Sequence, residues 1–309
     1  MLFFICIRNE IKVVSLQFEK KTVMTISNGN VSISVAEHGG ELVSLKKNGH
    51  EYLWSGDARF WSRQAPILFP AVGKPFNNEI HVGGKSFPIK QHGFARDSEF
   101  EVIGNGCMRM KESTFGANYP YRLALEVCYR LEGSTVKAVW TVENLDDKEA
   151  FFQIGAHPGF LLPDYEATDD VHGYIQYYNH DGRPKQPVVV SSLNDGNRVP
   201  LATPRNIMSE MPLRNDTFAQ DALMFEGGQV AMAVLCDKKK DRLLGVCCPQ
   251  AEAFGVWAPH KEGCPFVCLE PWCGICDLYG FVGDISTRQY IHRLLPHEEY
   301  MFAYTIIIY

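Results

Sequence analysis

The sequence predicts an all-β sandwich, and three observations support this fold class. Val136, Ala138 and Trp140 alternate with more polar neighbours, which is the period of a strand with one buried face. Similar short segments recur from end to end of the chain, separated by turn signals. No long segment has a convincing helical period. We therefore expect one domain of many antiparallel strands, with few or no long helices.

The first half of the chain reads as a series of strands and turns. Asn48-Gly49 is typical of a tight hairpin turn, and Glu132-Gly133-Ser134 separates the two longest expected strands. Residues 65–74 are apolar but contain two prolines, which suit neither a central strand nor a helix interior. We expect a buried loop there that delivers Lys74. The expected strands cover 31–35, 42–45, 51–54, 99–103, 122–131 and 136–142.

The second half is less regular. A strand over 151–154 places His157 just past its end. Residues 163–220 are polar and rich in turns, so we expect long surface connections with short strands in this region. The remaining expected strands cover 230–235, 243–248, 254–257, the run that ends at Glu270, and 299–309. We expect residues 1–22 to be an N-terminal extension and 23–309 to form the single domain.

Composition excludes several classes of protein. The chain has 309 residues, of which 46% are hydrophobic, so it can bury a sizeable core. Its formal net charge is -6 and its basic residues are scattered, which argues against nucleic acid as a partner. No segment approaches the roughly 20 apolar residues that span a bilayer. The apolar run 1–7 lacks a basic segment before it and a small-residue cleavage site after it, so we expect no secretion signal.

Ten cysteines raise the question of disulfides. They are irregularly placed and lie mostly inside apolar runs, which favours buried free thiols in a reducing cytoplasm over a secreted disulfide framework. We therefore expect a cytoplasmic protein. The cysteines within apolar runs are Cys128, Cys236, Cys247, Cys248 and Cys268.

Glu270 is the most informative candidate for chemistry. It lies at the end of an apolar run, in Val267-Cys268-Leu269-Glu270-Pro271-Trp272. Desolvation by apolar and aromatic neighbours raises the pKa of a carboxyl group and makes it a usable general base near neutral pH. A structural carboxylate held by an ion pair is the alternative at this position.

Three segments together resemble the signature blocks of the aldose 1-epimerases, the galactose mutarotase-like proteins. They are Gln91-His92-Gly93-Phe94-Ala95-Arg96-Asp97, Gly155-Ala156-His157-Pro158-Gly159-Phe160 and Leu269-Glu270-Pro271-Trp272. The resemblance extends from about Val23 to the C-terminus in block order and includes residues 68–73. The first block is similar to that of a less characterised bacterial branch.

This resemblance implies a large antiparallel β-supersandwich and an enzyme that interconverts the α and β anomers of free sugars. Catalysis would need no metal and no cofactor, and the partner would be a small sugar bound by a monomer or homodimer. Glu270 would take the proton of the C1 hydroxyl, and His157 would protonate the ring oxygen. A histidine suits this role because its ordinary pKa of about 6.5 leaves both forms accessible. His92 would orient the sugar.

Other residues are weaker candidates for binding substrate. Lys74 stands where better known relatives have arginine. Lysine keeps the positive charge but lacks the planar guanidinium group with its paired N–H donors. Asp221 would bind sugar hydroxyls or serve as a turn residue, and Arg96 would bind substrate or pair with Asp97. Phe160 would stack on a sugar face, although aromatic residues of a sandwich are more often core. Trp257 and Trp272 are open to the same two interpretations.

Cys273-Gly274-Ile275-Cys276 is a rival motif, because it matches a thioredoxin-type C-x-x-C pattern. That chemistry needs a helix after the first cysteine, and residues 277–283 do not suit one. Cys264 and Cys268 would complete four cysteines, but the spacing is not that of paired zinc knuckles.

Two functional alternatives remain open. A hexose-phosphate epimerase would need Lys74, Arg63 and Arg96 to converge at the rim of the pocket. A carbohydrate-binding protein on the same fold would bind sugar without turning it over.

Overall fold

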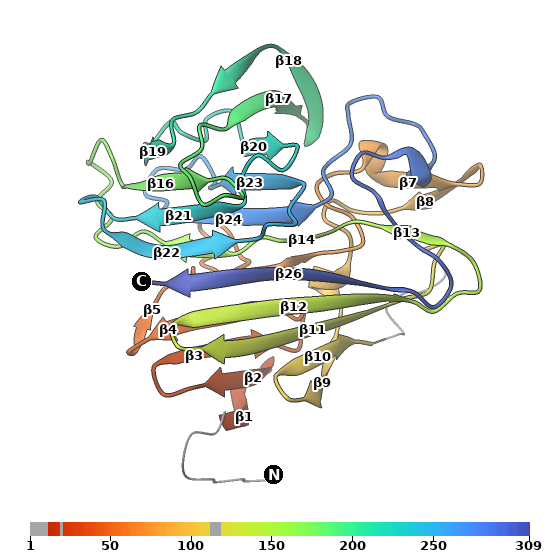
Figure 1. Ribbon diagram of the computed structural model, residues 1–309, viewed down its shortest axis with the longest axis horizontal. Coiled ribbons are helices and arrows are strands. Elements are labelled where there is room, and N and C mark those ends of the chain that lie inside the picture. The colour runs from red at the N-terminus through yellow and green to blue at the C-terminus, as the bar shows by residue number, and fades with distance from the viewer. Residues whose placement is uncertain (1–11, 19–20, 112–118) are drawn as a thin grey trace.

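The computed structural model describes residues 12–18, 21–111 and 119–309 and consists almost entirely of antiparallel sheets (Figure 1). The expected all-β class is confirmed, because the helices of these residues are single 3-10 turns. They are η1 (Phe76–Asn78), η2 (Ala95–Asp97) and η4 (Ile285–Thr287). No helix in these ranges is long and apolar enough to cross a membrane. The apolar run 1–7 lies outside the described residues.

The largest sheet has nine strands, and its middle is formed by long strands that lie side by side in Figure 1. Val136, Ala138 and Trp140 alternate into the core as the sequence predicts. In order across the sheet, the strands are β19 (Glu210–Leu213), β16 (Gly173–Tyr178), β21 (Met232–Cys236), β22 (Arg242–Cys247), β26 (Glu299–Ile308), β12 (Thr135–Asn144), β11 (Leu123–Glu132), β10 (Cys107–Met110) and β9 (Phe100–Gly104).

A five-stranded meander occupies the N-terminal part of the chain, at the bottom of Figure 1. It turns at Asn48-Gly49, where both residues have positive φ. Its strands are β1 (Lys12–Phe18), β2 (Lys21–Ser27), β3 (Val31–Ala36), β4 (Leu42–Lys47) and β5 (His50–Glu51).

A six-stranded sheet carries the residues of greatest chemical interest. Its central strand is wholly buried, and the sheet's order is β20 (Leu223–Glu226), β23 (Ala253–Trp257), β24 (Phe266–Cys273), β14 (Ile154–Ala156) and β6 (Ile67–Leu68), with β15 (Gly159–Leu161) also paired to β24. Residues 65–74 thus form mostly loop, as expected, but contribute one short strand at the edge of the sheet.

Three two-stranded units complete the fold. They are β13 (Ala150–Phe152) with β25 (His292–Leu294), β7 (Glu79–Val82) with β8 (Lys85–Pro88), and β17 (Val188–Asn194) with β18 (Asn197–Asn206). The prediction of only short strands between 163 and 220 is wrong. Strand β18 has ten residues, and β16 lies within the nine-stranded sheet. Strand β18 is exposed along most of its length and contains two prolines, so its sequence lacks the pattern of a half-buried strand.

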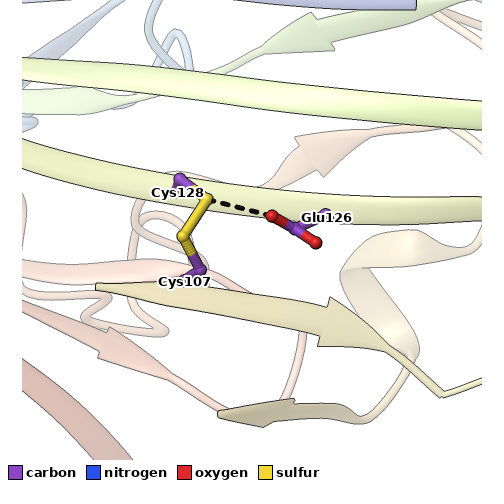
Figure 2. Close-up of side chains that lie close together, drawn as sticks. All are labelled: Cys107, Glu126 and Cys128. Atoms are coloured by element: carbon purple, nitrogen blue, oxygen red, sulfur yellow. Dashed lines mark hydrogen bonds between the residues drawn. A yellow bond between two sulfur atoms is a disulfide. The ribbon is translucent and has the colours of Figure 1, made fainter. Parts of the chain in front are cut away.

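One cysteine prediction is also wrong. Cys128 is not a free thiol, because it forms a disulfide with Cys107 directly opposite it on β10 (Figure 2). The Glu126 carboxylate lies 3.3 Å from the Cys128 sulfur; this is a contact rather than a hydrogen bond, since a disulfide sulfur carries no proton. The other four cysteines of the apolar runs are free.

Candidate active site

Strand β24 holds Glu270 inside the molecule. All eight residues of β24 are buried, and Glu270 lies opposite Gly255 of β23 with 1% of its surface exposed. Side chains two apart on a strand share a face, so Cys268 and Trp272 lie on the same side of the sheet as Glu270. The sheet therefore places the carboxylate in an apolar and aromatic environment.

His157 follows the neighbouring strand and meets this carboxylate. Strand β14 pairs with β24 through Gly155 and Trp272, which brings the chain just beyond it alongside Glu270. The Nε2 atom of His157 lies 3.1 Å from Oε2 of Glu270, and both side chains are buried. This distance is within hydrogen-bond reach.

Burial shifts the pKa values of Glu270 and His157 in opposite directions. It raises the pKa of Glu270 well above its usual value, and the negative charge of Asp221 adds to this effect. Burial lowers the pKa of His157 to about 3, and the charges of Arg96 and Arg63 also lower it. Both shifts favour the neutral forms. A proton shared by the pair therefore resides on Glu270, with His157 as a neutral imidazole.

His92 presents a fixed donor to the same region. Its ring lies 5.6 Å from that of His157, and its Nδ1 accepts a hydrogen bond from the Gly73 backbone N–H at 3.1 Å. Burial lowers the pKa of His92 well below its usual value, so the ring is neutral. With Nδ1 acting as an acceptor, this hydrogen bond assigns the proton to Nε2, which lies 3.3 Å from the side-chain amide of Gln91.

The loop that carries His92 depends on a close backbone approach. Gly93 has φ +69°, and a Cβ atom there would lie 2.2 Å from the Phe69 carbonyl oxygen. Only glycine fits this contact. The His92 backbone N–H also donates to the Gly73 carbonyl at 2.8 Å, so the loop is held against the end of the 65–74 segment.

These residues surround a cavity of about 300 Å³. Four buried polar atoms of its lining, Glu270 Oε1, His157 Nδ1, Arg96 Nε and Trp272 Nε1, have no hydrogen-bond partner among the described residues. Buried polar groups in folded proteins are normally paired, so these atoms are suited to bind a polar ligand. The lining consists of Trp61, Gly73, Gln91, His92, Arg96, His157, Leu193, Gly196, Asp221, Ala222, Met224, Trp257, Glu270, Trp272 and Cys276.

Arg96 lines the cavity and does not pair with Asp97. Its Nη2 donates to the Gln91 carbonyl at 2.7 Å, whereas the Asp97 carboxylate accepts from Arg63 at 2.7 Å. Burial is the main cause that lowers the pKa of Arg96 to about 10, so the guanidinium stays charged at neutral pH. Arg63 is absent from the cavity lining.

The remaining candidates are placed differently from one another. Asp221 lines the cavity. Lys74 lies in an adjoining outer cavity, where its Nζ donates to Asp195 Oδ2 at 2.7 Å and to the Asp195 carbonyl at 2.9 Å. Phe160 is not brought to either cavity. It is fully buried in β15, in the core.

Aromatic side chains form part of the wall: Trp257 and Trp272, two of the stacking candidates, and Trp61, which no sequence signal marked. The Trp61 ring lies 4.9 Å from the His157 ring, and that of Trp257 lies 5.7 Å from it. Trp61 sits on an irregular loop, so no periodicity marked it. Gln91 also lines the cavity, and its position next to His92 in the same sequence block could have marked it. Nothing in the sequence marked Leu193 or Met224 as lining residues.

The C-x-x-C residues do not have the environment of a redox motif. Cys273 ends strand β24 rather than preceding a helix, and both Cys273 and Cys276 are free and buried. Cys276 packs against Gly73, where a Cβ atom would lie 2.3 Å from the Cys276 Cβ. Burial raises the pKa of Cys273 to about 11 and of Cys276 to about 12, opposite to the shift that a reactive thiol requires.

Donor atoms that could approach a metal ion also occur here. Within the described residues, ligand atoms of His157, Cys268 and Glu270 lie within 4.8 Å of one another. The pairing of β14 with β24 accounts for the closeness of His157 and Glu270 without an ion.

A buried carboxylate–imidazole pair in a polar pocket of an antiparallel supersandwich defines the class of this protein. Residues 22–279 match the aldose 1-epimerase family, and the chain belongs to it. This membership supports a sugar epimerase or mutarotase role, and with it an isomerase-type enzyme.

Individual relatives are distant but cover almost the whole chain. The chromosomal protein LacX of Lactococcus lactis is 26% identical over 297 residues, which is 92% of this chain and 98% of LacX. The galactose mutarotase related enzyme of Lactobacillus acidophilus superposes with a TM-score of 0.83 at 27% identity, covering 93% of this chain and 97% of its own. A galactose mutarotase-like protein of Lactobacillus casei gives a TM-score of 0.80 at 26% identity. The match covers 93% of this chain and 100% of that protein's chain.

Proposed function

We propose that this protein is an aldose 1-epimerase that interconverts sugar anomers by ring opening and reclosure, with Glu270 and His157 as its acid–base pair. The observation that carries the proposal is their buried contact of 3.1 Å beside a cavity with unpartnered polar atoms. Anomerisation needs one group that removes the C1 hydroxyl proton and one that protonates the ring oxygen. The pair supplies both.

The proton shared by Glu270 and His157 determines the order of events. Ring opening requires an ionised Glu270 and a protonated His157, so the proton first passes from Oε2 to Nε2 over the 3.1 Å that separates them. Glu270 then accepts the C1 hydroxyl proton while His157 gives its proton to the ring oxygen. The pair is left as neutral Glu270 and neutral His157, which is the distribution that burial favours.

Reclosure reverses these transfers after rotation about the C1–C2 bond. His157 removes the proton of the C5 hydroxyl and Glu270 returns a proton to the aldehyde oxygen. The neutral pair is therefore present with the cyclic sugars and with the open-chain aldehyde alike, and the ionised pair forms only during the proton transfers between them.

Other lining residues have roles in orienting the sugar. The Nε2–H of His92 is a donor for the ring oxygen or the C1 hydroxyl, and Arg96 and Asp221 can bind further hydroxyls. Trp61 and Trp257 offer apolar faces next to His157. Aromatic faces pack well against the C–H surface of a sugar ring because both are apolar.

The hexose-phosphate alternative has less support. Its three candidate cations do not converge, since Arg63 is bonded to Asp97 and Lys74 to Asp195. Of the three, Arg96 alone lines the inner cavity.

Polarimetry tests the proposal. Freshly dissolved α-D-glucose and α-D-galactose should change rotation faster with the protein, and Glu270→Gln should reduce the acceleration about 10²- to 10⁴-fold, the range for an acid–base group. Glu132→Gln, in an exposed pair with Lys137 on the β11–β12 hairpin, is the control and should keep full activity. Sugar binding without acceleration in the wild type would indicate a carbohydrate-binding protein instead.

A further inference from the structure

A second cluster of potential metal ligands lies on the reverse face of the strand that carries Glu270. Glu270 and Cys273 are three residues apart on β24, so their side chains point to opposite faces of the six-stranded sheet. One ligand atom each of Glu252, Cys273 and His292 lies within 4.8 Å of the other two. None of these three side chains lines the inner cavity, so the proposed acid–base reaction leaves them without a role.

Three separate segments bring these side chains together. Cys273 ends β24, and β23 pairs with β24 through Ala253 and Trp272, which places Glu252 beside Cys273. The Glu252 backbone N–H also donates to the Trp272 carbonyl at 2.9 Å. His292 begins β25, whose partner β13 leads directly into β14, the neighbour of β24. Strand pairing therefore fixes the backbone of all three residues.

Two aromatic rings hold the His292 imidazole in place. The ring centroid of Tyr300 lies 4.5 Å from that of His292, and the centroid of Phe152 lies 5.7 Å from it. The Nε2 atom of His292 lies 3.1 Å from Oε2 of Glu252. The Tyr300 hydroxyl also hydrogen-bonds with the Cys273 side chain. The ligand atoms are thus preorganised, which reduces the cost of ordering them around an ion.

An ion can reach this cluster from solvent. Cys273 is fully buried, whereas 34% of the Glu252 side chain and 18% of the His292 side chain are exposed. The His157–Glu270 pair of the inner cavity differs, because both side chains are buried and burial favours the protonated form of Glu270. Metal ligands must be deprotonated, so a neutral carboxyl group is a poor ligand. The cluster around Cys273 is therefore the better metal site of the two.

The chemistry of the three side chains selects zinc. Thiolate, imidazole and carboxylate are zinc ligands, whereas Ca²⁺ and Mg²⁺ take oxygen ligands. Zinc bonds of about 2.0–2.3 Å at tetrahedral angles separate two ligand atoms by about 3.3–3.8 Å, which small side-chain shifts achieve here. Burial raises the pKa of Cys273 to about 11, so the thiol releases its proton to solvent as the zinc–sulfur bond forms. Thiolate and carboxylate then balance the double charge of the ion.

We propose that Glu252, Cys273 and His292 form a binding site for one Zn²⁺ ion, with a water molecule in the fourth position. The site is independent of the acid–base pair and lies behind the strand that carries it. A bound ion links the start of β23, the end of β24 and β25, which are distant in sequence. Because the three ligands come together only in the folded chain, zinc should stabilise the fold.

Cobalt spectroscopy tests the site. Co²⁺ occupies zinc sites and gives a thiolate-to-cobalt absorption band in the near ultraviolet only when a cysteine is a ligand. Chelator-treated protein is titrated with Co²⁺ without oxygen or reductant, so that the Cys107–Cys128 disulfide stays closed. The band should saturate at one Co²⁺ per chain and disappear when Zn²⁺ is added. Absence of the band in the wild type would mean that Glu252 and His292 form an ordinary ion pair, and would overturn the proposal.

Variants locate the ion. Cys273→Ala should abolish the band, and Cys236→Ala, which truncates a buried free thiol of the nine-stranded sheet, is the matched control that should keep it. Glu270→Gln should also keep the band. Loss of the band in Glu270→Gln and its retention in Cys273→Ala would place the ion in the inner cavity and contradict the proposal.

The partly exposed ligands provide a test that does not depend on the folding of Cys273→Ala. His292→Gln and Glu252→Gln should weaken Zn²⁺ binding in calorimetric titrations by more than the roughly 10- to 100-fold that loss of an outer-shell partner costs. Zn²⁺ should also raise the midpoint of thermal unfolding of the wild type and Cys236→Ala, but not of His292→Gln. Unchanged affinity in both ligand variants, or an equal rise of the midpoint in all three proteins, would contradict the site.

Discussion

Glu270 and Glu226 are two inward-facing carboxylates of the six-stranded sheet, each paired with a basic side chain, and they differ in how well they are satisfied. Glu226 accepts hydrogen bonds from Arg198 and from the Ser191 hydroxyl, so both its oxygens are used. Glu270 contacts His157 through Oε2 at 3.1 Å, and its Oε1 has no hydrogen-bond partner among the described residues.

This difference separates a structural pair from a functional one. Arg198 extends the Glu226 network by donating to the Cys276 carbonyl at 2.9 Å and to Gln289 Oε1 at 2.7 Å. A fully satisfied buried network makes one arrangement of the chain rigid. Here it supports the backbone of Cys276, which lines the inner cavity. The unsatisfied Glu270 faces that cavity and is free to react.

Glu226→Gln provides the largest expected effect. The substitution removes the charge that compensates the buried Arg198, which should lower the free energy of unfolding by about 3–5 kcal/mol. Urea denaturation followed by circular dichroism measures it. Glu132→Gln breaks an exposed ion pair and should cost no more than about 1 kcal/mol. Similar small losses in both variants would remove the distinction between a structural and a surface pair.

Glu270→Gln should raise the free energy of unfolding at neutral pH, the opposite of the effect of Glu226→Gln. A carboxyl group whose pKa is raised in the folded state stabilises the fold below its unfolded pKa of about 4.5, and this contribution is lost as pH rises above that value. The glutamine amide carries no charge and does not lose this contribution at any pH. The variant should therefore be more stable than the wild type by about 1–3 kcal/mol at pH 7.

The pH dependence of that difference is its signature. Urea unfolding at several pH values should show the stability advantage of the variant growing above pH 4.5. The lowered pKa of His157 acts in the other direction. The free energy of unfolding falls progressively as the pH is lowered from about 6.5 to 3. A variant less stable than the wild type at pH 7 would mean that Glu270 is a structural group like Glu226.

The smallest effect concerns catalysis between pH 5 and 7. The pair is active with one proton, and His157 takes a second proton only near its lowered pKa of about 3. The raised pKa of Glu270 delays loss of the shared proton on the alkaline side. We therefore expect kcat/KM to vary less than about twofold over this interval. A steep fall below pH 6.5 in polarimetry would show that His157 titrates as an ordinary histidine.

Much of the architecture could be predicted from local pattern. Period-two alternation identified the strands around Trp140, and Asn-Gly identified a tight turn at Asn48. The alternation failed where both faces of a strand are largely exposed, as in β18. The same alternation indicates the outward position of Cys128, because Cys128 is on the face of β11 that carries Glu126 and not on the face of the buried Val127. Its partner Cys107 depends on strand pairing, which no local signal records.

The candidate site was predictable where distinctive sequence blocks lie on neighbouring strands or just beyond them. Glu270, His157 and His92 are brought together because β24, β14 and the loop against β6 are neighbours in one sheet. Lys74 could not be placed in advance, because its partner Asp195 comes from a distant hairpin. Whether Phe160 faces a ligand or the core depends on a shift of one residue along β15, which the sequence does not determine.

The aromatic wall around His157 has a spectroscopic consequence. Trp61 lies 4.9 Å from the imidazole and Trp257 5.7 Å from it. A protonated imidazole quenches the fluorescence of a nearby indole more than a neutral one does. Tryptophan emission therefore reports where the catalytic proton resides, and stopped-flow fluorescence could follow its passage between Glu270 and His157 during a single turnover, without any added label.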